Sequence, residues 1–150
     1  LDLVSEAWVA ALAARLTVPF YAALSYDGAM SWEPDTGDDA DVTTFFNAHQ
    51  RLDKGLGRAL GPDAAPRTAA IFKAAGFEVL TANSPWQLGP EMAPLQIMLN
   101  DGIAQAAEEA GMENTPKWAD ARRKTAETGR TTVGHVDLLA IPSTKFQKTS

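Results

Sequence analysis

Three strand-like segments separated by helical segments most strongly constrain how this chain can fold. Residues 18–25 form a short apolar and aromatic run, residues 77–82 alternate, and residues 132–141 alternate strongly between two faces. Alternation with a period of two favours β-strands, and β-branched and aromatic residues add to that preference. Strands separated by helices favour a sheet covered by helices. We therefore expect an α/β fold.

Helical periodicity fills the intervals between these strands. In residues 3–16 the apolar side chains recur every four positions, which predicts a helix with Trp8 in the core. Asp41 can cap a helix that runs to about Lys54. Further helices are expected over residues 66–75, 92–110 and 115–128. The inward face of the fourth expected helix comprises Leu95, Met98, Leu99, Ile103 and Ala106.

Two local signals predict turns. Asp27-Gly28 is a hairpin signal, so we expect a turn there with residues 30–32 as a return strand. Residues 84–90 contain two prolines and a glycine and are expected to be a loop.

Three strands make a thin sheet for a chain of 150 residues, and its edge would be open. The chain also begins with Leu1 instead of Met. We therefore expect part of a larger domain over residues 1–142, followed by a flexible tail over residues 143–150. An open sheet edge also makes a homo-oligomer a possible partner arrangement.

Composition excludes several classes of function. The chain has no cysteine, which excludes disulfides, thiolate metal sites and thiol catalysis. The formal net charge of −6 disfavours a nucleic-acid partner. No apolar run approaches the roughly 20 residues that span a bilayer, so no membrane partner is expected. These features fit a cytoplasmic protein with a small-molecule substrate.

Several phrases together resemble the carboxy-terminal half of class I S-adenosylmethionine-dependent methyltransferases. "VPFYAALSYDG" is similar to the fifth strand of that family, "FKAAGFEV" to the helix and start of the sixth, and "GHVDLLAIP" to the seventh. "FFNAHQRLDKGLGRALGP" resembles an insertion found in some bacterial members. The resemblance implies a partial Rossmann-like sheet whose last strand is antiparallel, and S-adenosylmethionine as cofactor of the intact protein.

The glycine-rich cofactor loop of that family has no counterpart here. The family places it after the first strand, whereas Gly55-Leu56-Gly57 follows an expected helix. Glycines in that position end a helix and form a turn. The chain alone is therefore expected to lack most of the cofactor site, and its cofactor-binding residues stay unknown.

His49 is the candidate catalytic base. It lies on the apolar face of the helix expected over residues 41–54, with Asp53 four residues later, where a carboxylate can hold one imidazole nitrogen. Asn47 and Gln50 flank it as candidate substrate-binding amides. The alternative is a histidine at the edge of the core that Asp53 merely satisfies. His135 and His49 are too far apart in sequence to form a metal motif.

Four further residues are candidates for the substrate pocket. Tyr26 and Asp27 follow the first strand, where open α/β sheets bind ligands. Trp32 and Trp86 lie near proline-bearing loops and could wall a pocket, although packing over the core is an equal alternative.

Two other functions remain open at this point. The chain could be a non-catalytic ligand-binding or assembly module that pairs through its sheet edge. A small hydrolase using His49 and Asp53 is less favoured, because no serine lies in a G-x-S-x-G turn between a strand and a helix.

Overall fold

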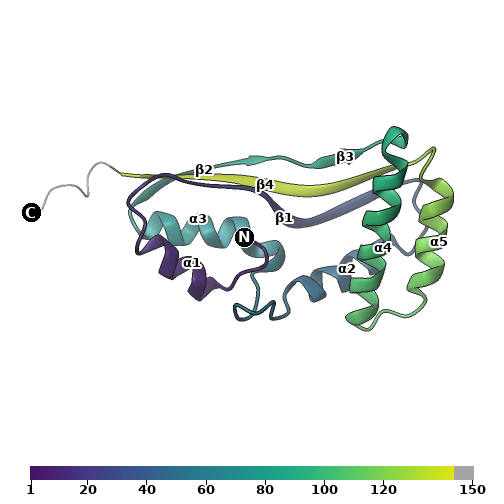
Figure 1. The fold of residues 1–150 in the computed structure, drawn as a ribbon, viewed down its shortest axis with the longest axis horizontal. Helices are drawn as coiled ribbons and strands as arrows, with labels where there is room; N and C mark the ends of the chain where they lie inside the picture. Colours follow the sequence, from purple (N-terminus) through teal and green to yellow (C-terminus); the bar gives the residue numbers. More distant parts are fainter. Residues whose placement is uncertain (144–150) are drawn as a thin grey trace, which may run out of the picture. The chain divides into compact units, whose positions relative to one another are not determined.

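The computed structural model describes residues 1–143, and its strands form an open four-stranded sheet with helices. The strands are β1 (Phe20–Glu33), β2 (Phe77–Asn83), β3 (Trp86–Leu88) and β4 (Arg130–Pro142). The order is β1-β4-β2, and β3 also pairs with β4 (Figure 1). β4 runs antiparallel to β2 and to β3. The α/β class expected from the sequence is confirmed, and β3 is a strand that the sequence did not predict.

The described chain divides into two compact units. Unit 1 consists of Leu1–Asp27, Arg51–Ser84 and the chain from His135 onward, and unit 2 consists of Gly28–Gln50 and Pro85–Gly134. The long strands β1 and β4 contribute residues to both units. The expected tail falls outside the described residues, apart from Ser143.

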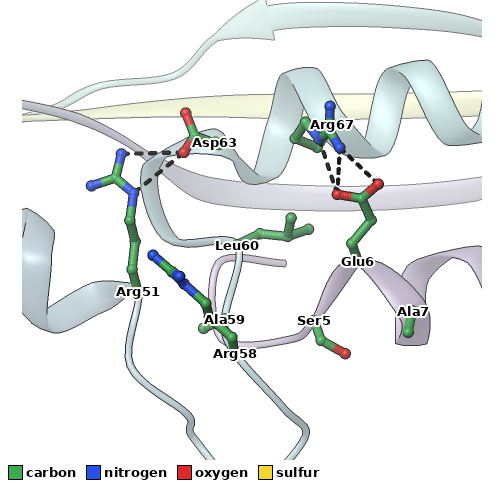
Figure 2. Close-up of a pocket in the computed structure, with 9 residues that line it drawn as sticks. All are labelled: Ser5, Glu6, Ala7, Arg51, Arg58, Ala59, Leu60, Asp63 and Arg67. Atoms are coloured by element: carbon green, nitrogen blue, oxygen red, sulfur yellow. Dashed lines mark hydrogen bonds and ion pairs between the residues drawn. The ribbon is translucent and has the colours of Figure 1, made fainter.

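In unit 1, the segment that precedes helix α3 (Ala64–Ala74) is fixed to the start of the chain. The amide of Leu60 donates to the carbonyl of Val4 and the amide of Gly61 to that of Asp2, both at 2.9 Å. These bonds place Leu60 and the 3₁₀ turn Gly61–Asp63 beside the first turn of helix α1 (Glu6–Ala13), as Figure 2 shows.

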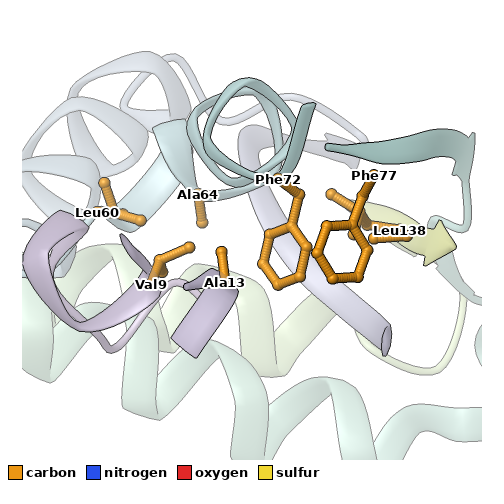
Figure 3. Packing of buried hydrophobic residues seen from close by; sticks show 8 residues of the cluster. Val9, Ala13, Leu60, Ala64, Phe72, Phe77 and Leu138 are labelled. Carbon is orange, nitrogen blue, oxygen red and sulfur yellow. The ribbon is translucent and has the colours of Figure 1, made fainter. Parts of the chain in front are cut away.

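The core of unit 1 lies between these two helices and one face of the sheet. The ring of Phe72 stacks on Phe20 and meets Phe77 edge-on, with both centroid distances at 5.0 Å. Figure 3 shows the surrounding apolar side chains, which come from α1, α3, the strands and, for Leu60, the segment that precedes α3. The cluster comprises Val9, Ala13, Leu60, Ala64, Phe72, Phe77, Leu138 and Ala140. Burial of this continuous apolar surface holds unit 1 together.

The other face of the sheet in unit 1 is exposed. Leu80 pairs with Leu139 and Ala82 with Asp137, so these side chains share a face opposite to that of Phe77 and Leu138. Leu80 is 64% exposed. The described part of unit 1 therefore covers only one side of its sheet with helices.

Unit 2 packs three helices around an aromatic core. They are α2 (Asp39–Gln50), α4 (Ala93–Glu109), which follows the 3₁₀ turn Pro90–Met92, and α5 (Thr115–Thr125). Trp32 and Trp118 meet edge-on at a centroid distance of 5.2 Å. The buried members of this core are Trp32, Val42, Ile103, Ala104, Trp118 and Ala119. Pro116 in the first turn of α5 and Gly111 beyond α4 mark the helix boundaries expected for these residues.

Several local predictions were wrong. No turn forms at Asp27-Gly28, because β1 continues to Glu33 and the positive φ of Gly28 is accommodated inside the strand. The segment expected to be a loop contains β3. Trp8 is 40% exposed, since Val9 and Ala13 instead face the core of unit 1.

The inward face of α4 also differs from the prediction. Leu95 and Met98 are exposed, whereas Gln96 and Asn100 are buried. Gln96 donates to the carbonyl of Gly89 at 2.7 Å, and Asn100 accepts from the indole of Trp32 at 2.9 Å. Satisfied hydrogen bonds make the burial of these polar side chains possible.

Candidate functional site

His49 lies in the last turn of α2 and has a carboxylate partner other than the expected one. Its Nε2 is 2.9 Å from Oε2 of Glu109, at the end of α4. The imidazole is mostly buried while Glu109 is exposed. A carboxylate at this distance fixes the orientation of the imidazole ring. His49 is therefore paired with a carboxylate, but this carboxylate belongs to Glu109 and not to Asp53.

Asp53 has a structural position that the sequence did not predict. α2 ends at Gln50, four residues before the expected end, so Asp53 does not follow His49 on a helix. Its Oδ1 instead accepts a hydrogen bond from the amide of Gly55 at 2.7 Å, and its backbone forms an antiparallel bridge with Arg58. Asp53 therefore closes a turn, as aspartate often does in this geometry.

The other residues predicted around His49 are dispersed. The amide of Asn47 donates to the carbonyl of Gly28 at 3.0 Å, and Gln50 ends α2 with a half-buried side chain. Trp32 belongs to the core of unit 2, where its indole donates to Asn100. Trp86 is partly exposed on β3.

Tyr26 and Asp27 lie where β1 leaves unit 1. Tyr26 is buried, and its ring meets that of His135 edge-on at a centroid distance of 6.4 Å. Burial raises the pKa of Tyr26 above its ordinary value, and the negative charge of Asp27 adds to that shift. The phenol therefore stays protonated at neutral pH and can only donate or accept a hydrogen bond.

Another polar cluster lies in unit 1 and is centred on Asp137. The sequence did not predict it. Its carboxylate accepts hydrogen bonds from the hydroxyl of Ser84 at 2.6 Å, the phenol of Tyr21 and the backbone amide of Leu24 at 2.9 Å. These bonds, that of Ser84 first, lower the pKa of Asp137 to about 2. The carboxylate is therefore ionised at neutral pH and cannot serve as a proton donor.

Asp137 also supports an unusual backbone conformation. Leu24 has a φ of +54°, which is uncommon for a residue with a side chain. The amide of Leu24 is bonded to Asp137. We interpret the cluster as a structural support that fixes the path of β1 before Ser25 and Tyr26.

A concave site that lies wholly in unit 1 is called the arginine pocket here. It has a volume of about 610 Å³, within the range of small-molecule sites. Figure 2 shows its lining, which comes from the start of α1, the segment after α2 and the start of α3. The lining residues are Ser5, Glu6, Ala7, Arg51, Arg58, Ala59, Leu60, Asp63 and Arg67.

Two of the three arginines in this pocket are held by carboxylates. Arg67 forms a bidentate pair with Glu6, the shortest distance being 2.6 Å, and Arg51 bonds Asp63 at 3.2 Å. The guanidinium of Arg58 has no side-chain partner within residues 1–143. Figure 2 shows the Arg58 side chain extending toward the Arg51–Asp63 pair.

The sequence carried only weak signals for this pocket. Its charged residues are spread over residues 6–67, and three of them lie in the stretch "RLDKGLGR" and just beyond it. The glycines of that stretch do serve as turn residues, since Gly55 and Gly57 have φ of +97° and +83°. Nothing local indicates that the start of the chain packs against it.

Comparison with known proteins supplies no identity. No protein-family model matches this chain, and no curated protein matches it. Within residues 1–143, no helix has the length and apolar character needed to cross a membrane. The same residues contain no group of three histidine, aspartate or glutamate side chains placed to hold a metal ion.

Proposed function

We propose that this chain is part of an S-adenosylmethionine-dependent methyltransferase that acts on a small molecule. In this proposal the chain contributes elements of the substrate pocket and of the sheet edge. The observation that carries it is the antiparallel pairing of β2 with β4, the last strand. β2 and β4 are antiparallel over their shared length, from Phe77 opposite Pro142 to Asn83 opposite Val136. A last strand that runs antiparallel to its neighbour is what the family resemblance implies.

The position of β1 also supports the proposal. β1 is an edge strand, with β4 as its neighbour in the sheet order. The segment that resembles the fifth strand of the family therefore lies beside the segment that resembles the seventh. An edge strand of this length offers a place for further strands.

The residues present do not fit the cofactor itself. Gly55 and Gly57 follow a helix and sit in a turn closed by Asp53, not between a strand and a helix. The two turns of residues 1–143 that lead from a strand toward a helix, after β1 and after β3, each contain a single glycine, Gly37 and Gly89, whereas dinucleotide-type folds hold the cofactor with several closely spaced glycines. In this proposal the cofactor loop is supplied by sequence outside these 150 residues.

His49 is the residue we propose as general base, with Glu109 now as its orienting carboxylate. The 2.9 Å contact orients the imidazole ring, and in this proposal the ring accepts a proton from the substrate. Substitution of His49 by Ala is expected to lower turnover of the intact enzyme by roughly 10²-fold or more. Unchanged turnover would remove His49 from the mechanism.

The decisive experiment is calorimetry with S-adenosylmethionine. The 150-residue chain is expected to show weak or no binding, and a chain extended by the preceding coding sequence is expected to bind clearly. The upstream sequence should contain a strand, a glycine turn and an acidic strand end. A start codon immediately before Leu1, or an extended chain that does not bind the cofactor, would contradict the proposal.

A non-catalytic ligand-binding module is the second candidate. The arginine pocket favours it, because all of its lining residues belong to unit 1. In that case a ligand would bind to the 150-residue chain without S-adenosylmethionine and without turnover.

A further inference from the structure

We propose that the arginine pocket binds the oxyanion group of a small molecule, either a carboxylate or a phosphoryl group. The inference does not rest on methyl transfer, because it concerns residues of unit 1 alone and can be tested without S-adenosylmethionine.

The charges lining the pocket favour an anion. Three guanidinium groups face two carboxylates, so the lining carries one excess positive charge in a chain whose net charge is −6. The excess resides on Arg58, the guanidinium without a side-chain partner in the described chain. The planar fork of an arginine matches the two oxygens of a carboxylate or phosphoryl group.

The backbone holds Arg58 at the pocket. The turn closed by Asp53 precedes it, and its own backbone bridges to Asp53. The amides of Leu60 and Gly61, just after it, are bonded to the first residues of the chain. Because the backbone is fixed on both sides, an ion bound by Arg58 would not have to order a loop.

Gly57 allows the segment before Arg58 to lie close to Ser5. A Cβ atom at position 57 would lie 3.2 Å from Cβ of Ser5, and the φ of +83° is one that other residues rarely adopt. A glycine here lets the segment carrying Arg58 pack against the start of α1.

The start of α1 adds a second source of positive potential. Ser5 caps the helix by accepting from the amide of Trp8 at 3.3 Å. Amides of a first helical turn have no acceptor within the helix and carry a partial positive charge. Ser5, Glu6 and Ala7 all line the pocket, so an anion beside Arg58 would also lie near this helix end.

The test is calorimetric titration of the 150-residue chain at fixed ionic strength, with inorganic pyrophosphate in one series and malonate in another. Saturable binding at one site is expected for at least one of these probes, and the preferred probe identifies the oxyanion class. Arg58→Gln is expected to weaken binding roughly tenfold or more. Arg15→Gln makes the same charge change in unit 1 outside the pocket and is expected to weaken it by about twofold or less.

A second variant protects the test against a folding defect. Glu6→Gln removes a negative charge from the lining and releases Arg67, so binding should become about two- to fivefold tighter. A gain of affinity cannot come from loss of structure. Absence of saturable binding of both probes to the wild type would overturn the proposal, as would equal weakening by Arg58→Gln and Arg15→Gln.

Discussion

Arg122 of unit 2 and the arginines of the pocket in unit 1 differ in burial and in role. In unit 2, Arg122 is 2% exposed and lies over the rings of Trp32 and Trp118, at 5.4 and 5.7 Å from their centroids. In unit 1, Arg58 and Arg67 are exposed at the edge of an open pocket. The same side chain is therefore a packing element in one unit and accessible to a ligand in the other.

The partners of Arg122 complete this contrast. Its guanidinium donates to Asp39 at 2.5 and 2.6 Å, to the hydroxyl of Thr36 and to the carbonyl of Pro34, each at 2.8 Å. Asp39 also accepts from the indole of Trp118 at 2.7 Å. Such a buried, multiply bonded charge fixes the arrangement of the elements around it, whereas an exposed charge contributes little to stability.

The largest expected effect is therefore on unit 2. Arg122→Met leaves the carboxylate of Asp39, which is 13% exposed, without its cation. The free energy of unfolding should fall by about 3–5 kcal/mol, as measured by chemical denaturation. The adjacent Arg123 is exposed and pairs with Asp101 and Asp120, so Arg123→Met is the matched control, with a loss below about 1 kcal/mol. Equal losses in the two variants would refute the contrast between buried and exposed arginines.

Buried hydroxyl groups offer a second comparison between the units. In unit 2, Thr131 donates to Oε1 of Gln96 at 2.9 Å, whereas in unit 1 the hydroxyl of Thr68 has no hydrogen-bond partner among the described residues. Thr131→Val should cost about 1–3 kcal/mol, because it removes the donor to Oε1 of Gln96. Thr68→Val removes an unsatisfied group and should be neutral or stabilising. A destabilising Thr68→Val would show that Thr68 has a partner, such as a bound water.

Periodicity predicted the type and place of most elements in both units. The alternation over residues 132–141 corresponds to β4 (Arg130–Pro142), and the expected helix over residues 92–110 corresponds to α4 (Ala93–Glu109). These signals are strong because each element buries one continuous face. The hairpin at Asp27-Gly28 was wrong because a short turn signal cannot compete with the pairing of β1 and β4.

Burial of polar residues could not be predicted in the same way. Gln96 is buried because its amide reaches the carbonyls of Gly89, Ala126 and Gly129, which come from other segments of unit 2. The partners of Asp137 likewise lie more than 50 residues away in sequence. Which residues distant in sequence become hydrogen-bond partners depends on the fold and cannot be predicted from a single sequence.

The candidate site shows the same limit. The sequence predicted that a carboxylate would hold His49. Because α2 ends at Gln50, Asp53 does not lie one helical turn after His49, and the partner is Glu109 instead. The arginine pocket depends on backbone bonds from Leu60 and Gly61 to residues at the start of the chain. Hydrogen bonds between backbone atoms do not require particular side chains, so the sequence contains no pattern that predicts them.

A pH-dependent effect is expected from the Asp137 cluster of unit 1. Its folded pKa of about 2 lies below the ordinary value of 3.8. The cluster therefore stabilises the fold above about pH 4, and this contribution is lost as the pH falls toward 2. Between pH 4 and pH 2, the unfolding temperature of Asp137→Asn should therefore fall less than that of the wild type.

The control for that comparison is Asp41→Asn, which changes an exposed carboxylate that no hydrogen bond or ion pair holds within residues 1–143. This variant should follow the wild-type dependence on pH. If the Asp137→Asn curve also parallels the wild type between pH 4 and 2, the hydrogen bonds of Ser84, Tyr21 and Leu24 do not stabilise the charged form.

The smallest expected effect on stability belongs to the ion pair of the arginine pocket. Glu6 and Arg67 are both about half exposed, so solvent screens their attraction even though Glu6 raises the pKa of Arg67. Thermal unfolding of Glu6→Gln should be indistinguishable from that of the wild type at neutral pH. A clear decrease in the unfolding temperature would mean that this pair holds α1 to α3 as Arg122 holds its neighbours in unit 2. The arginine pocket would then be a structural ion-pair cluster, and the contrast between the two units would disappear.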